Sequence, residues 1–204
     1  GEEINIISDN SDSEEQQILN QDTSITLGAF TTDLEAVEED LEFRREKRDS
    51  RLKRNFDEIR FWTDYLTPSA ASYIYDDNNH FGGLSKDKAF VILGDLNADA
   101  IDGNSIKTGI HRLIHHPRII DPKPSSEGGK AHRKENPNAK YHTAFWGMRA
   151  DYVLPAKAQL SVLDSGIFWP QTNKAEFRLV KDRAASSDHR LVWVDVAFKH
   201  PAKK

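Results

Sequence analysis

Polar residues follow an apolar stretch in the segment FVILGDLNAD, residues 90–99. The apolar run stops at a glycine, and Asp95 and Asn97 come directly after it. Because they are two positions apart, their side chains point the same way in an extended chain. A carboxylate and an amide so placed could orient a water molecule and hydrogen-bond a substrate oxygen. The same spacing also fits an Asx turn that closes a strand, and this alternative stays open.

Two further stretches place polar residues beside apolar ones. MRADYVLPA (148–156) puts Asp151 at the start of an apolar segment, and SSDHRLVWVDV (186–196) puts Asp188 and His189 before another. A carboxylate beside an imidazole fixes the tautomer of the histidine and favours its protonated form. Carboxylates without thiolates suit a hard cation such as Mg²⁺. These residues predict metal-assisted chemistry on a phosphoester.

The charge of the chain is unevenly distributed. Of its 33 Asp and Glu residues, thirteen lie in residues 1–43, where there is no Lys or Arg. Such a composition is typical of a disordered segment. We expect an acidic arm over residues 1–43, a folded domain over 44–198 and a basic tail over 199–204. The basic folded part could attract a phosphate-bearing partner such as nucleic acid, although its charge also fits an ordinary surface.

The pattern of apolar residues predicts an α/β or α+β fold, with a strand and a helix followed by several strands. Helices are expected over 55–66 and 105–116, and residues 121–140 read as a long loop. Strands are expected over 89–93, 141–146, 151–154, 159–163 and 191–198. The continuous apolar run at 89–93 predicts a strand covered on both faces. No stretch is long and apolar enough to predict a membrane span, and the absence of cysteine excludes disulfides.

The three motifs resemble those of the endonuclease/exonuclease/phosphatase superfamily. GDLNAD (94–99) is similar to its Gly-Asp-x-Asn motif, RADYVL (149–154) to its Arg-x-Asp-Tyr motif, and SSDHRLV (186–192) to its terminal Ser-Asp-His motif, in the family's order. RNFDEIRFWTDYL (54–66), GGL (82–84) and NADAIDG (97–103) resemble a bacterial, often exported subgroup. That resemblance implies an extracellular or periplasmic location. It covers residues 44–198.

The resemblance also implies a fold and a mechanism. The family fold is a four-layer α/β sandwich, and its members use a metal-assisted water for in-line attack on phosphorus. Carried over, Asp95 would activate or orient the water or protonate the leaving group, and Asn97 would hydrogen-bond the phosphate or the water. Asp188 would bind the metal or support a ligand of it. His189 would stabilise charge on the phosphoryl oxygens or act as an acid or base, held by Asp151. The implied cofactor is Mg²⁺, with Mn²⁺ or Ca²⁺ as alternatives.

One part of the family pattern is missing from the sequence. Family members carry an early Asn and a metal-binding Glu strand in the N-terminal half, and nothing in residues 1–53 matches them. The resemblance therefore implies the C-terminal part of the sandwich, a mixed sheet with flanking helices, without its N-terminal half. We expect a phosphoester hydrolase, nuclease or phosphatase, that is weakly active or inactive alone and gains activity with the missing half as a partner.

Other interpretations remain beside this one. The alternative function is a non-catalytic remnant that serves as a nucleic-acid or protein interaction module. GDLNADAIDG could also be a Ca²⁺ loop, although Ala100 and Ile106 stand where such loops need Gly and Glu. Arg149 and His142 are candidates for substrate binding. Arg149 lies two positions before Asp151 and should face the same way, and His142 falls in the strand expected before it.

Overall fold

The computed structural model describes residues 34–199. The chain divides into two compact units, Gly1–Glu46 and Lys47–Lys204. The acidic arm expected over residues 1–43 lies mostly outside the described residues, but helix α2 (Leu34–Leu66) already begins within it. No helix between residues 34 and 199 has the length and apolar character that a membrane crossing requires.

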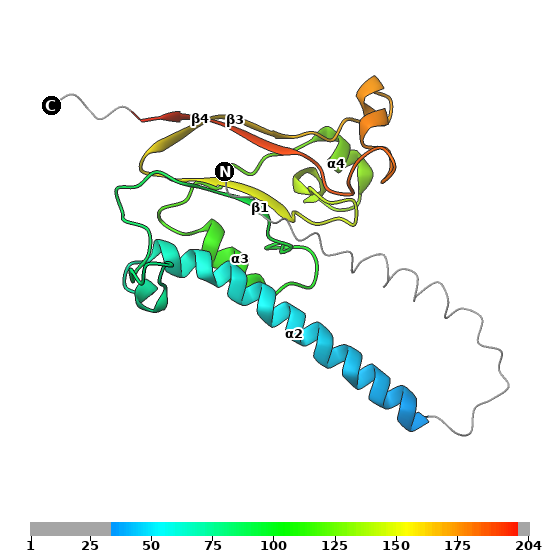
Figure 1. The fold of residues 1–204 in the computed structure, drawn as a ribbon. Helices are drawn as coiled ribbons and strands as arrows, with labels where there is room; N and C mark the ends of the chain where they lie inside the picture. The colour runs from blue at the N-terminus through cyan, green and yellow to red at the C-terminus, as the bar shows by residue number, and fades with distance from the viewer. Residues whose placement is uncertain (1–33, 200–204) are drawn as a thin grey trace. The chain divides into compact units, whose positions relative to one another are not determined.

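Short helices and antiparallel strands make up the second unit, which is an α+β arrangement (Figure 1). Besides α2, the helices are α3 (Lys107–Ile114) and α4 (Glu127–His132), with 3₁₀ turns η2 (Ala71–Tyr73), η3 (Ala139–Tyr141) and η4 (Ala175–Leu179). The strands are β1 (Val91–Asp95), β2 (Asp151–Pro155), β3 (Leu160–Ile167) and β4 (Val192–Phe198). Among the described residues every strand pair is antiparallel, so the expected mixed sheet is not found there. The four-layer sandwich stays a prediction.

The strands form two antiparallel pairs. β1 pairs with β2, from Val91 opposite Pro155 to Asp95 opposite Asp151. β3 pairs with β4, with a bulge between Val162 and Asp164 of β3. β2 and β4 lie near each other, and single bridges from Ala144 to both Met148 and His189 join the segments that lead into these two strands. The starts of β2 and β4 therefore come together at one edge.

The hydrophobic core lies between α2, α3 and one face of the β1–β2 pair. Ile110 and Leu113 of α3 are fully buried and belong to one cluster with Ile92 of β1 and Leu154 of β2. The helix repeat explains this contact, because residues three or four positions apart share one face of α3. Gly109 allows α3 to approach α2 closely, since a Cβ there would lie 2.9 Å from the Phe56 ring.

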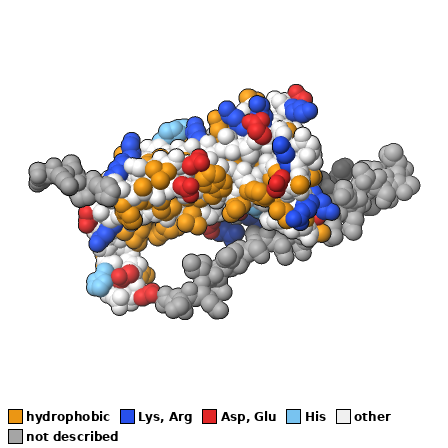
Figure 2. Space-filling view, turned by 90° about the horizontal axis from the view of Figure 1, so that it is seen from above, with side chains coloured by type: hydrophobic (Ala, Val, Ile, Leu, Met, Phe, Trp, Pro, Cys, Tyr) orange, Lys and Arg blue, Asp and Glu red, His pale blue; other side chains and the backbone are white. Residues whose placement is uncertain are grey.

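The opposite face of the strands is open within the described residues. Only Ile92 of β1 is buried, and Leu93 beside it is 70% exposed. β3 and β4 likewise expose Leu163 and Phe198, and Figure 2 shows hydrophobic side chains gathered on this side of the molecule. Within residues 34–199 the strand expected to be covered on both faces is covered on one face only, because an apolar run does not distinguish a covered face from an open one.

Two other expected elements differ from the structure. Residues 141–146 form no strand and instead leave η3 through the isolated bridge at Ala144. Residues 121–140 are not all loop, because α4 begins after Ser126, whose hydroxyl accepts a hydrogen bond from the Gly129 N–H. Two consecutive glycines in this helix hid it from the propensity pattern. They are needed because the backbone of Trp169 packs against Gly128.

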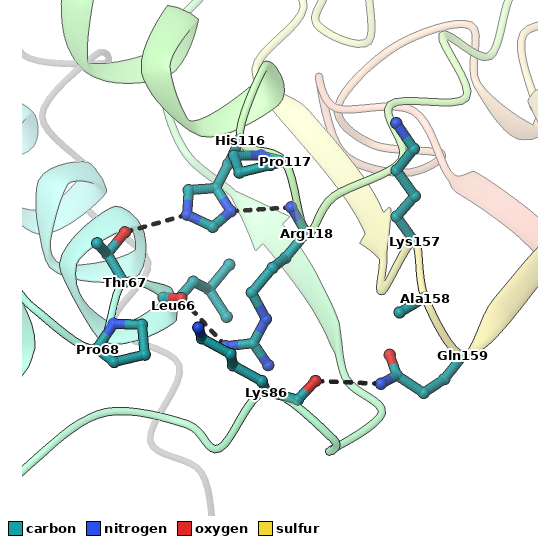
Figure 3. A pocket seen from close by; sticks show the side chains of 10 residues that line it. All are labelled: Leu66, Thr67, Pro68, Lys86, His116, Pro117, Arg118, Lys157, Ala158 and Gln159. Atoms are coloured by element: carbon teal, nitrogen blue, oxygen red, sulfur yellow. Dashed lines mark hydrogen bonds between the residues drawn. The ribbon is translucent and has the colours of Figure 1, made fainter.

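Arg118 ties the end of α2 to the following loop (Figure 3). Its guanidinium donates hydrogen bonds to the carbonyls of Leu66, Leu84 and Ser85, at 3.1, 2.8 and 2.7 Å. The Leu66 carbonyl belongs to the last turn of α2 and has no partner inside the helix. His116 fixes the same corner, with ring nitrogens bonded to the Thr67 hydroxyl and the Arg118 N–H. Burial of the His116 ring lowers its pKa, so this corner favours the neutral imidazole.

Candidate active site

Asp95 ends β1 on the open face of the strands. Gly94 before it has a φ of +140°, which favours glycine. The register places Asp95 directly opposite Asp151, the first residue of β2. Residues opposite each other in an antiparallel pair point to the same face, so the two carboxylates share one side of the sheet.

His189 joins this pair of carboxylates. Its Nδ1 lies 3.1 and 3.0 Å from the two oxygens of Asp151, and its Nε2 lies 3.9 Å from an oxygen of Asp95. A carboxylate only accepts hydrogen bonds, so Nδ1 carries the proton and donates it to Asp151. Nε2 then faces Asp95 and the open side. One ligand atom from each of the three residues can be chosen so that all lie within 4.8 Å of one another.

Thr143 holds Asp151 in place and was not identified from the sequence. Its hydroxyl donates to an Asp151 oxygen at 2.6 Å and accepts from the N–H groups of Ala150 and Asp151. Thr143 is fully buried, so these bonds are shielded from water. A threonine eight positions before Asp151 has no periodic relation to it, and no sequence signal separated it from other loop hydroxyls.

The electrostatic surroundings favour a charged imidazole at His189. The hydrogen bond to Asp151 raises the pKa of His189 above its ordinary value, against the lowering effect of burial, and the charges of Asp151 and Asp95 add to the rise. The Trp146 ring stands edge-on to the imidazole, with centroids 4.8 Å apart, and covers one side of it. The site therefore presents a histidine that remains cationic to higher pH than a free one.

Replacing Asp151 with Asn tests this electrostatic coupling. We expect the pKa of His189 to fall, because the neutral amide no longer favours the imidazolium. In the parent, the pKa of His189 is higher in the folded state than in the unfolded state, where it is about 6.5. The charged imidazole therefore stabilises the fold below pH 6.5, and this stabilisation is lost as the pH rises through the pKa of the folded state. Asp151→Asn should therefore destabilise more at pH 5.5 than at pH 9. NMR titration of the ring and urea unfolding at both pH values measure these effects, with Asp164→Asn on β3 as the control.

Asn97 lies beside Asp95 with its backbone turned. Its N–H donates to the Asp95 carboxylate at 2.7 Å and its φ is +42°, a conformation that asparagine tolerates. The Asx turn named as one alternative is thus present. It uses one carboxylate oxygen of Asp95, while the other lies 3.9 Å from His189. The turn and a chemical role for Asp95 are therefore compatible.

Asp188, the expected metal ligand, is turned differently from the three clustered residues. Its carboxylate accepts a hydrogen bond from the guanidinium of Arg183. Burial raises the pKa of Asp188, but the hydrogen bond and charge of Arg183, a backbone hydrogen bond and the charge of His189 together lower it below its ordinary value. Asp188 is not part of the group formed by Asp95, Asp151 and His189. Its role at a metal stays a prediction.

The two candidates for substrate binding do not join the cluster. Arg149 is buried and forms a double hydrogen bond with Asp121, at 2.9 and 2.5 Å, while its guanidinium lies over the Tyr152 ring. Arg149 was expected to face the same way as Asp151, but β2 begins only at Asp151, so the alternation of side chains along a strand does not extend to Arg149. His142 is 1% exposed, with Nε2 at 2.9 Å from Asp102. Substrate binding by either residue stays a prediction that this placement does not favour.

A second acidic group surrounds His142. Asp99, Asp102 and His142 also offer ligand atoms within 4.8 Å of one another. The Asp99 carboxylate accepts hydrogen bonds from the N–H groups of Ile101, Asp102 and Arg149. These three donors occupy the Asp99 oxygens, so we interpret the group as a hydrogen-bond network that stabilises the loop after β1. Asp95 and Asp99 fall in separate groups, which does not support the Ca²⁺ loop.

Comparison with known families decides the affiliation. The model of the Endonuclease/Exonuclease/phosphatase family matches residues 15–189. The chain belongs to this family. The match begins in the acidic segment, upstream of the region that the motifs alone indicated. No curated protein and no solved structure matches the chain at the threshold applied. Members of the family are generally metal-dependent phosphoester hydrolases.

The donor atoms of the site fit a hard divalent cation in part. Asp95 and Asp151 offer carboxylate oxygens, which such ions prefer. However, the Asp151 oxygens already accept hydrogen bonds from Thr143 and His189. Two carboxylates are few for a site made of protein ligands, although Mg²⁺ usually keeps several waters. An ion here would need further oxygen ligands from water, from substrate or from another carboxylate.

Proposed function

We propose that the protein hydrolyses phosphoesters with a divalent cation, Mg²⁺ being the first candidate. One observation carries the proposal: Asp95, Asp151 and His189 lie together on the open face of the strands, with His189 held between the two carboxylates. Phosphoryl transfer needs chiefly positioning and neutralisation of charge on the phosphoryl oxygens. A cation and an imidazolium at one edge supply such neutralisation.

Each residue has a distinct part in this proposal. Asp95 and Asp151 would hold the ion, which when bound neutralises phosphoryl charge and lowers the pKa of a water ligand. Asp95 also orients the attacking water. Asn97 hydrogen-bonds the phosphate or the water. His189 donates from Nε2 to a phosphoryl oxygen, while Asp151 holds its Nδ1 proton. Asp188 would support the ion from the edge of the site.

We further propose that the site is completed by a second α/β half packed on the open face, as the family resemblance implies. The apolar side chains of Leu93, Leu163 and Phe198 are 70%, 68% and 72% exposed and lack a cover in the described part of the chain. Covering such a surface stabilises an assembly by about 25 cal/mol for each Å² of apolar area removed from water. The covering half would bring the additional carboxylate that the ion needs. Without it, the chain is expected to be weakly active.

The metal requirement gives the direct test. Hydrolysis of bis(p-nitrophenyl) phosphate should be slow but measurable with Mg²⁺ or Mn²⁺, disappear with EDTA and return with excess metal. Calorimetric titration with Mn²⁺ should show weaker binding in Asp95→Asn and unchanged binding in the control Asp102→Asn, because Asp102 lies in the second acidic group. Loss of binding in Asp102→Asn alone would place the ion there and contradict the proposal. A rate typical of complete enzymes would contradict the incomplete site.

A non-catalytic interaction module is the second candidate function. It is favoured by the Arg183–Asp188 ion pair, which occupies a carboxylate expected at the metal, and by the open apolar face. Under this function the purified chain would bind its partner with no hydrolysis above that of the metal alone. Replacement of His189 would then leave binding unchanged.

A further inference from the structure

A pocket of about 210 Å³ lies next to the candidate active site. It is lined by residues of α4 and η4 and by the segments that lead into β2 and β4. Three aromatic residues line it, Phe145, Trp169 and Phe177, together with four basic ones, His132, Lys134, Lys181 and Arg190. The volume is below the range of about 300–1,000 Å³ typical of pockets for drug-sized ligands. The pocket is therefore large enough for a ligand with a single ring system.

The pocket lining carries positive charge without a carboxylate of its own, although Lys181 pairs with Asp182 outside the lining at 3.6 Å. No Asp or Glu is among its lining residues. Arg190 is only 5% exposed, and its guanidinium bonds to the carbonyls of Ser187, His189 and Val180. Within residues 34–199 no carboxylate forms an ion pair with it, and its Nε is buried without a hydrogen-bond partner. Since a buried charge is costly unless it is compensated, the pocket favours a ligand that brings hydrogen-bond acceptors and a negative charge close by.

The aromatic residues give the pocket flat walls. The His132 ring lies 4.5 Å from Phe145 and 5.0 Å from Trp169 between centroids, and the Arg190 guanidinium stacks over Trp169 at 4.7 Å. These contacts hold the rings and the guanidinium in place before a ligand binds, so binding does not have to immobilise them. Phe145 remains 51% exposed and Phe177 is half-buried. Both rings can therefore offer a face to a planar ligand.

The pocket and the candidate active site share two chain segments. Phe145 precedes Trp146, whose ring contacts His189, and Arg190 follows His189. The Phe145 N–H donates to the Asp188 carbonyl at 2.9 Å and joins the segments. Phe145 and Trp146 lie in the turn between Ala144 and Met148, and His189 and Arg190 are consecutive residues of the segment that leads into β4. A polymer that reaches across this edge could thus place a phosphate at His189 and a flat group in the pocket.

We propose that this pocket holds one unpaired nucleobase of a single-stranded nucleic acid whose adjacent phosphate lies at His189. The inference rests on the proposed function and names its substrate class. Single-strand binding commonly combines positive charge along the backbone with stacking of bases on aromatic side chains. The lining offers both kinds of residue, and the polar side chains of Gln171 and Thr172 can bond to the edge of a base. A base within an intact duplex is not available for such a pocket.

Binding of labelled oligonucleotides in EDTA tests the pocket without cleavage. Three probes of twelve nucleotides are compared by fluorescence anisotropy: a thymidine strand, its duplex with the complement, and a strand of abasic residues. Phe177→Ala should weaken binding of the thymidine strand about tenfold, within the range of base stacking on one aromatic side chain. It should leave the abasic strand unchanged. The control is Leu179→Ala, because Leu179 lies on the same turn, is exposed and does not line the pocket.

A second variant tests the charge of the pocket without touching its packing. Lys134→Ala should weaken binding of the thymidine strand and lower the slope of log K against log salt by about 0.7, the value expected for one phosphate contact on a single strand. Lys130→Ala is the control, since Lys130 lies 3.9 Å from Glu127 and outside the pocket. Equal binding of thymidine and abasic strands by the parent would overturn the proposal. So would tighter binding of the duplex, or equal effects of Phe177→Ala and Leu179→Ala.

The proposed function can fail independently of this inference. If His189→Ala loses hydrolysis while Phe177→Ala behaves like its control, the pocket assignment is wrong and the hydrolase stands. If the chain shows no metal-dependent hydrolysis but Phe177 still distinguishes the thymidine strand from the abasic one, the pocket assignment is supported as a binding site. In that case the hydrolase proposal is wrong.

Discussion

Replacing His189 with alanine is expected to lower Mg²⁺-dependent phosphodiester hydrolysis about 1,000-fold, within the range of positioned acid–base groups. The imidazole lies between the two carboxylates, with Nδ1 on Asp151 and Nε2 toward Asp95. Its removal takes away a donor to the phosphoryl oxygens, while the carboxylates that would hold the ion remain. We therefore expect kcat to fall and KM to change little, as measured by initial rates on bis(p-nitrophenyl) phosphate.

His80→Ala serves as the matched control for this variant. His80 is an exposed histidine that pairs with Asp76 in a surface turn, at 3.1 Å and outside the site. Its removal should leave the rate unchanged. Because the coupling of His189 to Asp151 adds stability only at low pH, the urea midpoints are compared at pH 9, where the variant should stay close to the parent. A His189→Ala protein that keeps its fold and more than about a tenth of the parent rate would exclude an acid–base role for the imidazole.

The proximity of Asp95, Asp151 and His189 could be anticipated from the sequence, whereas the residues that hold them in place could not. Asp95, Asp151 and His189 each stand where an apolar stretch begins or ends, and such positions fall at the edges of sheets. The order of the three motifs predicted the family to which the chain belongs, and the match over residues 15–189 confirms this prediction. Nothing in the pattern gave the register that sets Asp95 opposite Asp151, because alternation fixes a face and leaves the pairing partner open.

Long-range polar contacts account for most of what sequence reasoning missed. Thr143 and Asp121 are single polar residues in irregular segments, and their partners are set by how loops pass one another. Arg190 directly follows His189 inside the SSDHRLV stretch and was not singled out, because burial of a charged side chain has no local sequence signal. The open face was missed for the same reason, since the apolar content of a strand does not show what covers it.

Replacing Asp121 with alanine is expected to destabilise the fold by about 3–5 kcal/mol, the usual cost of leaving one partner of a buried ion pair alone. The side chains of Arg149 and Asp121 are 8% and 9% exposed, and the guanidinium is held by two hydrogen bonds. Although burial lowers the pKa of Arg149, the Asp121 contact more than offsets it, so the group remains charged. A domain with a total stability of about 5–15 kcal/mol would lose much of it, and urea unfolding measures the loss.

A double replacement separates the cost of the unpaired charge from the worth of the pair. Asp121→Leu with Arg149→Met removes both charges, and methionine can still cover the Tyr152 ring on which Arg149 lies. Buried pairs replaced by apolar side chains of similar volume are often neutral in stability, so most of the loss should be recovered. Glu58→Ala breaks an exposed pair with Arg54 and should cost less than about 1 kcal/mol. If Asp121→Ala costs no more than Glu58→Ala, water reaches the guanidinium and the pair does not hold β2 against the loop before α4.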